Sequence, residues 1–425
     1  MVAIPVGDRG RRRLLTRAVP EVFVVTGGSM SQRGVVDCAR DLGYAICIVD
    51  GSPAAPLFAI ADHRIVRSFS DVEGVLEELR ARELEPVAVA TMGSDQAVEP
   101  TARLADALGL PGLSLETAAA VSDKRRMRAA FEAAGVPHPR GREADELGAA
   151  IGAWDELGPP VVVKPVDGSA QRGVTRVDAR DELEPAFARA RVASRRGVVV
   201  VEQYVEGDEY TVNGFCLDGE YVPATVTRRI LHPPPPLGVC IRHRYPSELT
   251  GERERGAFEL AAHASRAVGL STGPSYVQMR LGGGRPWVIE VGARLGGGKD
   301  AELAKLVIGF DTVRATVLSA LGRLSREELE RSREEPVATV GQVAFLVVEP
   351  GRIVRLDAAP ALELDGVHEA GFYWREGAIL PPLTSGAERL GYVVVTADSG
   401  EELDERTRRA FETLDIEIDR AGALV

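Results

Sequence analysis

Apolar runs alternate with helical segments near the start of the chain, and this alternation constrains the fold more than any other feature. The expected strands and helices lie, in chain order, at residues 22–26, 34–42, 44–50, 86–91 and 97–108. Strands and helices that alternate at this spacing predict an open parallel α/β sheet. Loops at the carboxyl ends of such strands usually face a ligand crevice. The Gly27-Gly28 turn lacks the third glycine of a dinucleotide fingerprint, so we do not expect a nicotinamide site.

Later segments predict a mixed α+β region and then a strand-rich end. One helix is expected over residues 114–134, with Ser114 as its N-cap. Antiparallel hairpins are expected at 210–227 and 275–291, and a final helix at 401–414. We therefore predict a loose basic arm, an open parallel α/β domain, a central α+β domain and a β-rich C-terminal domain. Their expected bounds are 1–20, 21–120, 121–330 and 331–425.

Composition excludes several classes of function. The 425 residues include 63 acidic and 51 basic side chains, a net charge of −12, which argues against a nucleic-acid binder. No apolar run approaches the roughly 18 residues that a membrane span needs. Neither a Cys-x-x-Cys pair nor a His/Cys cluster with zinc spacing occurs, so the four cysteines are expected to be free thiols. These features predict a cytoplasmic protein without nucleic-acid or membrane partners.

Lysine is rare in this chain, which makes its positions informative. Only four of the 51 basic residues are lysine, and Lys164 lies inside the apolar strand 161–165. A buried ammonium needs an anion, although Lys164 could also end the strand and extend into solvent. The loop 167–173 follows, and then another strand, so this hairpin differs from a P-loop yet could cover a polyphosphate. Lys124, taken alone, fits a solvated helix face better than a phosphate site.

Three acidic positions suggest further contacts with a nucleotide and its metal. Glu202 ends an apolar strand and Glu209 follows seven residues later, so either could accept ribose hydroxyls or simply be an edge-strand acid. Glu290 is flanked by apolar residues and therefore calls for a metal or a cation. Gln278 is its expected neighbour on the opposite strand. Arg294, four residues after Glu290, offers a planar fork suited to carboxylate or phosphoryl groups.

Taken together, these segments resemble the ATP-grasp superfamily. The motifs are Ser122-Asp-Lys124, Val-Val-Val-Lys164-Pro, the loop 167–173, Glu202-Gln-Tyr-Val-Glu-Gly-Asp-Glu209 and Val-Ile-Glu290-Val-Gly-Ala-Arg294. The resemblance implies two α+β subdomains that clamp ATP, with a lid subdomain at about 121–200. It also implies that the ATP phosphates are bound by Lys124, Lys164, Gly168, Ser169 and Gly173. Adenine would be held by Glu202, Gln203 and Val205, and the ribose by Glu209. Glu290 would bind the metal, and the catalytic Arg294 would contact the phosphoryl group.

The sequence departs from the family pattern at two positions. Gln278 stands where the first metal-binding strand usually offers an acid, and Gly292 stands where Asn is often found. The resemblance therefore implies Mg²⁺, with Mn²⁺ as an alternative, but leaves the number of ions open. Residues 343–353 and 391–397 look like the C-terminal domain of L-amino acid ligases, the dipeptide synthetases, among whose relatives homodimers are common.

The resemblance implies a carboxylate–amine ligase of the EC 6.3 type. ATP would phosphorylate the carboxylate of an amino acid or similar small acid, and an amine would attack the acylphosphate, releasing ADP and phosphate. Lys164 and Arg294 are the expected catalytic residues. Candidate substrate-binding residues are Arg228, Arg229, His243, Arg294, Gly296, Gly297 and Lys299. His243 could instead be a surface residue between two arginines. A carboxylase, a phosphotransferase and a nucleotide-binding relative without turnover remain alternatives.

Overall fold

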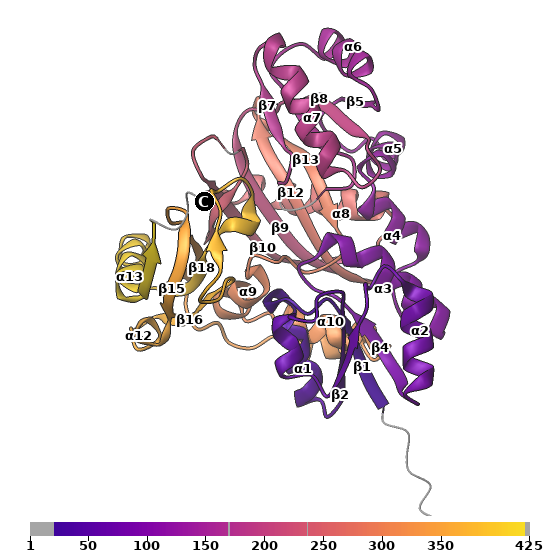
Figure 1. Ribbon diagram of the computed structural model, residues 1–425, viewed down its shortest axis with the longest axis vertical. Coiled ribbons are helices and arrows are strands. Elements are labelled where there is room, and N and C mark those ends of the chain that lie inside the picture. Colours follow the sequence, from indigo (N-terminus) through magenta and orange to yellow (C-terminus); the bar gives the residue numbers. More distant parts are fainter. Residues whose placement is uncertain (1–20, 169–170, 236, 421–425) are drawn as a thin grey trace, which may run out of the picture.

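The computed structural model describes residues 21–168, 171–235 and 237–420, so the arm proposed at 1–20 lies outside them (Figure 1). The N-terminal sheet has the order β3-β2-β1-β4. Its strands are β1 (Glu21–Thr26), β2 (Ala45–Asp50), β3 (His63–Val66) and β4 (Glu85–Ala90). All three pairings are parallel, as the strand–helix alternation predicts.

Helices cover both faces of this sheet. They are α1 (Arg33–Asp41), α2 (Val72–Ala81), α3 (Asp95–Leu108) and α10 (Thr312–Ala320). Alternate residues of a strand point to opposite faces. Accordingly, Phe23 and Val25 of β1 pack in one core with α1 and α10, whereas Val22 and Val24 pack in another with α2 and α3. The late helix α10 thus joins a distant part of the chain to the N-terminal sheet.

The single helix expected over 114–134 is instead two helices, α4 (Leu115–Ser122) and α5 (Lys124–Ala134). Asp123 between them is extended, and its carboxylate accepts a hydrogen bond from the backbone N–H of Arg125 at 2.9 Å. The same buried carboxylate pairs with Arg125 and Arg196. The break makes Lys124 the first residue of α5.

A small antiparallel sheet in the order β5-β8-β6-β7 forms the top of the molecule as drawn in Figure 1. Its strands are β5 (Gly141–Ala144), β6 (Val161–Pro165), β7 (Thr175–Val177) and β8 (Val199–Gln203). The helices α6 (Leu147–Leu157) and α7 (Leu183–Ala193) bury one face of it with Trp154 and Phe187. Because β6 and β7 pair antiparallel, the predicted strand–loop–strand hairpin is confirmed.

The largest sheet has eight strands in the order β13-β12-β9-β10-β11-β14-β18-β16. Their bounds are β9 (Asp208–Leu217), β10 (Glu220–Leu231), β11 (Cys240–Tyr245), β12 (Gly273–Gly282), β13 (Arg285–Gly292), β14 (Val340–Leu346), β16 (Val367–Phe372) and β18 (Gly391–Ala397). Both predicted hairpins are confirmed. Because β11 pairs with β14, this sheet contains strands from both sides of residue 330. The domain boundary expected at residue 330 stays a prediction.

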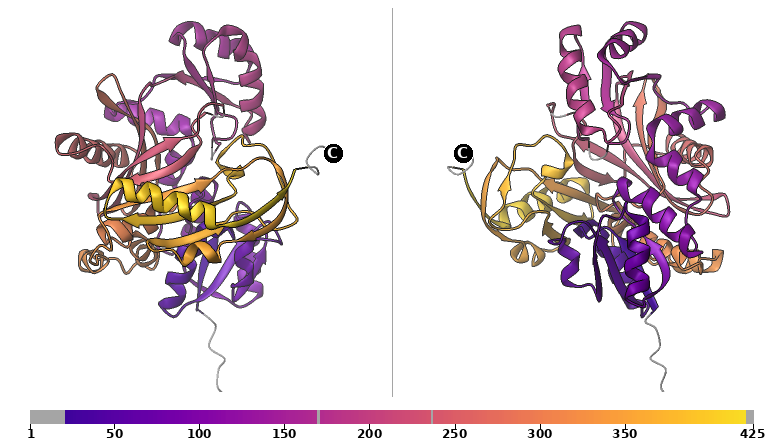
Figure 2. Two further views of the ribbon diagram at one scale, coloured as in Figure 1. Left: turned by 90° about the vertical axis from the view of Figure 1, so that its left-hand side faces the viewer. Right: turned by 45° about the vertical axis from the view of Figure 1, so that its right-hand side comes forward.

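The remaining elements cover this sheet or extend from it. They are α8 (Glu252–Ala267), α9 (Asp300–Ile308), α11 (Arg326–Arg331), α12 (Ala359–Leu362), α13 (Gly400–Thr413) and the three-stranded sheet of β17 (Ile379–Leu380), β15 (Gly351–Asp357) and β19 (Asp415–Asp419). Figure 2 shows α13, the predicted final helix, lying across the C-terminal strands. In the described part of the chain, no helix is long and apolar enough to cross a membrane.

Candidate active site

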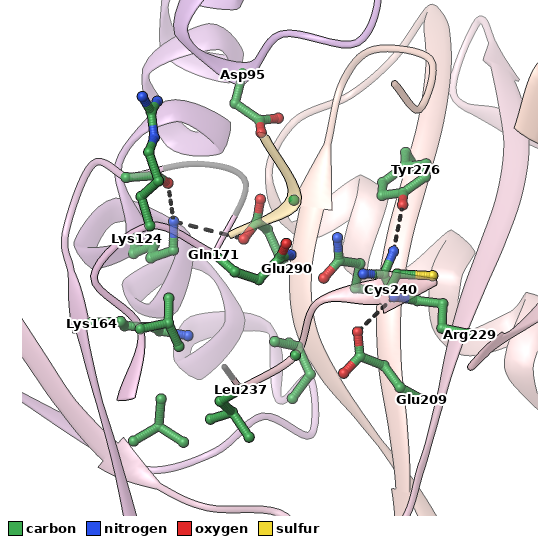
Figure 3. Close-up of a pocket in the computed structure, with 18 of the residues that line it drawn as sticks. Asp95, Lys124, Lys164, Gln171, Glu209, Arg229, Leu237, Cys240, Tyr276 and Glu290 are labelled. Atoms are coloured by element: carbon green, nitrogen blue, oxygen red, sulfur yellow. Dashed lines mark hydrogen bonds and ion pairs between the residues drawn. The ribbon is translucent and has the colours of Figure 1, made fainter. Parts of the chain in front are cut away.

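A cavity of about 370 Å³ lies where the small sheet, the large sheet, the N-terminal sheet and the segment before β18 meet (Figure 3). The predicted site residues that line it are Lys124, Lys164, Gly168, Glu202, Gln203, Val205, Glu209, Arg229, His243, Gln278, Glu290, Arg294 and Gly297. Gly173, Arg228, Gly296 and Lys299 are not among its lining residues, and Ser169 lies outside the described residues. The fold thus brings most of the predicted site together.

Lys164 is buried in β6, so its alternative placement in solvent is wrong. Its ammonium forms an ion pair with Glu202 on the neighbouring strand β8, and Arg128 of α5 contacts the same carboxylate. Burial and the nearby charges of Arg128 and Lys124 lower the pKa of Lys164. One carboxylate shared by two buried cations leaves positive charge that an added anion would neutralise.

Lys124 also faces the cavity rather than solvent. The helix taken alone favours a solvated helix face for Lys124, and that interpretation is wrong. Its Nζ donates a hydrogen bond to the backbone carbonyl of Gly168 at 3.0 Å. The same atom lies 3.6 Å from Glu290 Oε2 (Figure 3). Lys124 therefore joins the loop after β6 to the candidate metal-binding acid.

Glu209 lies between two arginines because of the register of the large sheet. It pairs across β9–β10 with Arg229 and across β9–β12 with Arg280. Arg229 Nε donates to Glu209 Oε1 at 2.7 Å and Arg280 Nε to Oε2 at 3.2 Å. Arg229 Nη1 also donates to the hydroxyl of Tyr276 at 3.1 Å. Glu209 is therefore an internal, cavity-facing acid, and the edge-strand alternative is wrong.

Arg228 is not brought into the cavity with Arg229. The two are consecutive on β10, and consecutive side chains of a strand point to opposite faces. Arg228 instead pairs with Asp208 at 3.0 Å and with Glu248 at 2.6 Å on the other face. The sequence makes both arginines candidates and favours a carboxylate-binding role for one of them; this alternation leaves Arg229 in the cavity and Arg228 outside it.

His243 is 2% exposed, so its surface alternative is wrong. Strand alternation turns the flanking Arg242 and Arg244 outward to Asp404 and His243 inward to the cavity. His243 Nδ1 lies 2.9 Å from Asp300 Oδ1 at the start of α9. Burial lowers the pKa of His243, but the charges of Asp300 and Cys240 and the hydrogen bonds to both together outweigh burial and raise the pKa to about 9. The imidazole is therefore a cation at neutral pH.

Gln278 and Glu290 are cross-strand partners on β12 and β13, as expected. Both line the cavity, with Lys124 close to the carboxylate. Within the described residues, no group of three or more His, Cys, Asp or Glu could hold a metal ion. Magnesium usually keeps waters and takes one or two carboxylates together with substrate phosphates. One carboxylate and one amide oxygen fit an ion that phosphates help to hold.

Arg294 meets a partner that the sequence motifs did not include. Its Nη2 lies 2.5 Å from Asp95 Oδ1, and its Nε donates to the same oxygen at 2.8 Å. The buried guanidinium also stacks over Tyr276, 4.7 Å from the ring centroid. Asp95 begins α3 directly after β4, at the carboxyl end of the N-terminal sheet. This position could have identified Asp95 from the sequence, because loops at the carboxyl ends of parallel strands face ligand crevices.

Two glycines after Arg294 permit close backbone approaches. A Cβ on Gly297 would lie 2.9 Å from the carbonyl oxygen of Gly93, and a Cβ on Gly298 would lie 2.8 Å from His243 Nε2. Side chains at 297 and 298 would therefore displace the N-terminal loop or the imidazole. Gly296 has a different role from that expected, because it packs against Tyr276 behind the cavity.

Lys299 is also turned away from the cavity. It has a left-handed backbone with φ of +63°. Its Nζ pairs with Glu302 at 2.9 Å and with Glu369 at 2.8 Å, and it lies over the ring of Tyr392. The two acids raise the pKa of Lys299 although burial opposes them. Lys299 therefore belongs to an internal ion-pair network and does not line the cavity, as its predicted substrate-binding role would require.

Two family models match this chain. The ATP-grasp domain matches residues 157–302, and the L-amino acid ligase C-terminal domain 2 matches residues 344–419. The D-alanine–D-alanine ligase of Gloeobacter violaceus is 32% identical over 64% of this chain and 83% of its own. The alanine–anticapsin ligase of Bacillus subtilis strain 168 is 24% identical over 70% of this chain and 67% of its own. The first curated relatives are matched over 64–67% of their own length.

The overall structure is similar to that of the L-amino acid ligase from Bacillus licheniformis, with a TM-score of 0.79 at 23% identity, covering 95% of this chain and 100% of that one. The chain belongs to the ATP-grasp superfamily, as its motifs predict. Its C-terminal region matches the L-amino acid ligase C-terminal domain 2, in agreement with the resemblance seen in the sequence. The predicted fold class and the enzyme class, a ligase of the EC 6.3 type, are likewise confirmed.

Proposed function

We propose that this protein uses ATP to join the carboxylate of an amino acid or similar small acid to an amine, through an acylphosphate. The observation that carries the proposal is the convergence of Lys124, Lys164, Glu290 and Arg294 on one cavity. Phosphoryl transfer needs positioned cations around the phosphates and little covalent chemistry from the protein. The cavity supplies those cations from three separate parts of the chain.

The nucleotide would lie between the small sheet and the large one. In this arrangement Lys164 and Lys124 contact phosphates under the loop that contains Gly168, and residues 202–205 hold the adenine. Glu209 would accept ribose hydroxyls from its position between its two arginine partners. A polyphosphate would also offset the unfavourable interaction among Lys164, Lys124 and Arg128.

Glu290 and Gln278 would hold Mg²⁺, or Mn²⁺ in its place, together with the phosphates. That ion would supply charge neutralisation at the transferred group. Arg294, oriented by Asp95, would donate hydrogen bonds to the oxygens of the phosphoryl group as the substrate carboxylate attacks. In that first step the bond between the γ-phosphorus and ADP breaks as the new P–O bond forms. The neutral amine would then attack the acyl carbon, and phosphate would leave as the C–O bond to it breaks and take up the proton that the amine loses.

His243 would not be the base that receives the amine's proton. With a pKa of about 9 it already carries a proton at neutral pH. A buried imidazolium beside the glycine run would instead bind a substrate oxygen or carboxylate by a charge-assisted hydrogen bond.

All four cysteines are free, which supports a cytoplasmic setting.

The experiment is a screen of L-amino acid pairs with Mg-ATP, read by ADP release and by mass spectrometry of the product. The proposal predicts ADP and phosphate release that depends on both substrates, with a new amide whose mass equals the pair minus water. Lys164→Ala and Glu290→Ala should abolish the reaction and keep the fold, whereas Lys305→Ala, on an exposed ion pair, should not. ATP binding without turnover across the panel would favour the non-catalytic alternative that Gln278 raises.

A further inference from the structure

Arg389 enters the cavity from the C-terminal lobe and differs from the other described cations there. Those cations have carboxylate partners, in the pairs Lys124–Glu290, Lys164–Glu202, Arg229–Glu209, Arg280–Glu209, His243–Asp300 and Arg294–Asp95, while Arg172 has interactions of its own. No ion pair between Arg389 and an acidic side chain occurs among residues 21–168, 171–235 and 237–420. Its charge is therefore available to an anionic ligand.

The guanidinium of Arg389 is held in place by neutral groups. Its Nε donates to the carbonyl oxygen of Gly386 at 2.8 Å, and its Nη1 donates to that of Cys240 at 3.2 Å. It stacks over the ring of Phe345 at 3.7 Å from the centroid. These contacts fix the plane of the fork without neutralising it. A fixed guanidinium is suited to bidentate binding of a carboxylate.

The position of Arg389 relates it to the reacting end of the cavity. Phe345, under Arg389, also meets the imidazole of His243 edge-on, with centroids 5.8 Å apart. His243 in turn lies against Gly298, four residues after Arg294. Contacts thus run from Gly298 through His243 and Phe345 to Arg389, and Arg294 lines the same cavity. A small molecule held by Arg389 would therefore lie in the same cavity as the proposed acylphosphate, on the side of the C-terminal lobe.

We propose that Arg389 binds the free carboxylate of an α-amino acid that serves as the amine substrate. This inference rests on the proposed ligase function and specifies one of its two substrates. In an α-amino acid the amine and the carboxylate share one carbon, so a carboxylate on Arg389 would hold the amine inside the cavity that His243 and Arg294 also line. The neutral amide of the same amino acid lacks the charge that Arg389 recognises.

The test compares amino acids with their amides as amine substrates, using the most active pair from the screen. Arg389→Gln should raise the KM of the amino acid about 10- to 150-fold, the loss of a charge-assisted hydrogen bond. Arg389→Lys should restore part of that loss. The KM values for ATP and for the amide should stay unchanged. Arg352→Gln is the matched control, because Arg352 is exposed on β15 and donates to Gly377 outside the cavity.

An unchanged KM for the amino acid in Arg389→Gln would overturn the inference, and so would an equal rise with the amide. A rise confined to the acid that becomes phosphorylated would also overturn it, since the bound carboxylate would then belong to the other substrate. Calorimetric titration with L-alanine and L-alaninamide, in the presence of ADP and Mg²⁺, separates the two proposals. Arg389-dependent binding of L-alanine without turnover refutes only the ligase function, and turnover independent of Arg389 refutes only this inference.

Discussion

Asp95 offers a direct test of how the N-terminal sheet supports the reaction. Its carboxylate contacts Arg294 at 2.5 and 2.8 Å, and Arg294 is 6% exposed. Asp95→Asn keeps one acceptor and removes the charge, whereas Asp95→Ala removes both. Because hydrogen bonds to charged groups contribute about 1.5–3 kcal/mol, we expect the two variants to mark the ends of that range. The corresponding falls in kcat are about 10-fold for Asn and about 150-fold for Ala.

The assay is steady-state ADP release with the most active substrate pair, together with thermal unfolding to verify the fold. The KM for ATP should stay near the wild-type value, because in the proposed reaction Asp95 acts through Arg294 at the transferred phosphoryl group. Asp37→Asn, which removes a charge from an exposed pair with Arg33, is the matched control and should leave kcat unchanged. A wild-type kcat in folded Asp95→Ala, or a loss seen only in the KM for ATP, would refute the reasoning.

Three further predictions concern the metal, the imidazole and the glycine run. Gln278→Glu should maintain or raise Mg²⁺ affinity, measured as the Mg²⁺ dependence of ADP binding, because it adds a carboxylate beside Glu290; weaker dependence would contradict this. His243, with its pKa raised to about 9, stabilises the fold fully below about pH 6.5 and loses that contribution as the pH rises to about 9. Denaturant unfolding should therefore show stability falling over this window, and His243→Gln should remove that part of the slope. Gly298→Ala should lower kcat more than about tenfold by displacing the imidazole, since its Cβ would lie 2.8 Å from Nε2. Gly256→Ala, in open space on α8, should leave kcat unchanged and control for the substitution itself.

Local patterns were sufficient to predict much of the candidate site. The alternation of apolar runs predicts the parallel N-terminal sheet, and the hairpin at 275–291 predicts that Gln278 faces Glu290. Strand alternation also explains two errors that sequence reasoning could have avoided. Consecutive Arg228 and Arg229 cannot share one face, and His243 must face opposite its arginine neighbours.

Other features depend on contacts that no local pattern contains. Asp95 meets Arg294 across 199 positions of sequence, and Arg389 reaches Cys240 across 149. The turn of Lys299 away from the cavity depends on its left-handed backbone and on Glu369, which lies on β16. Tertiary packing alone determines these three, so the sequence predicts more of the residues proposed to bind the nucleotide than of those proposed to bind the substrates.

The central claim is that ATP phosphorylates a substrate carboxylate in this cavity. The most direct measurement supplies the acid substrate with ¹⁸O in its carboxylate and follows the label by mass spectrometry. An acylphosphate intermediate requires one labelled oxygen to leave with the released phosphate. Phosphate with one ¹⁸O, formed only when acid and amine are both present, is the predicted result. Unlabelled phosphate, or label recovered in AMP, would contradict the account.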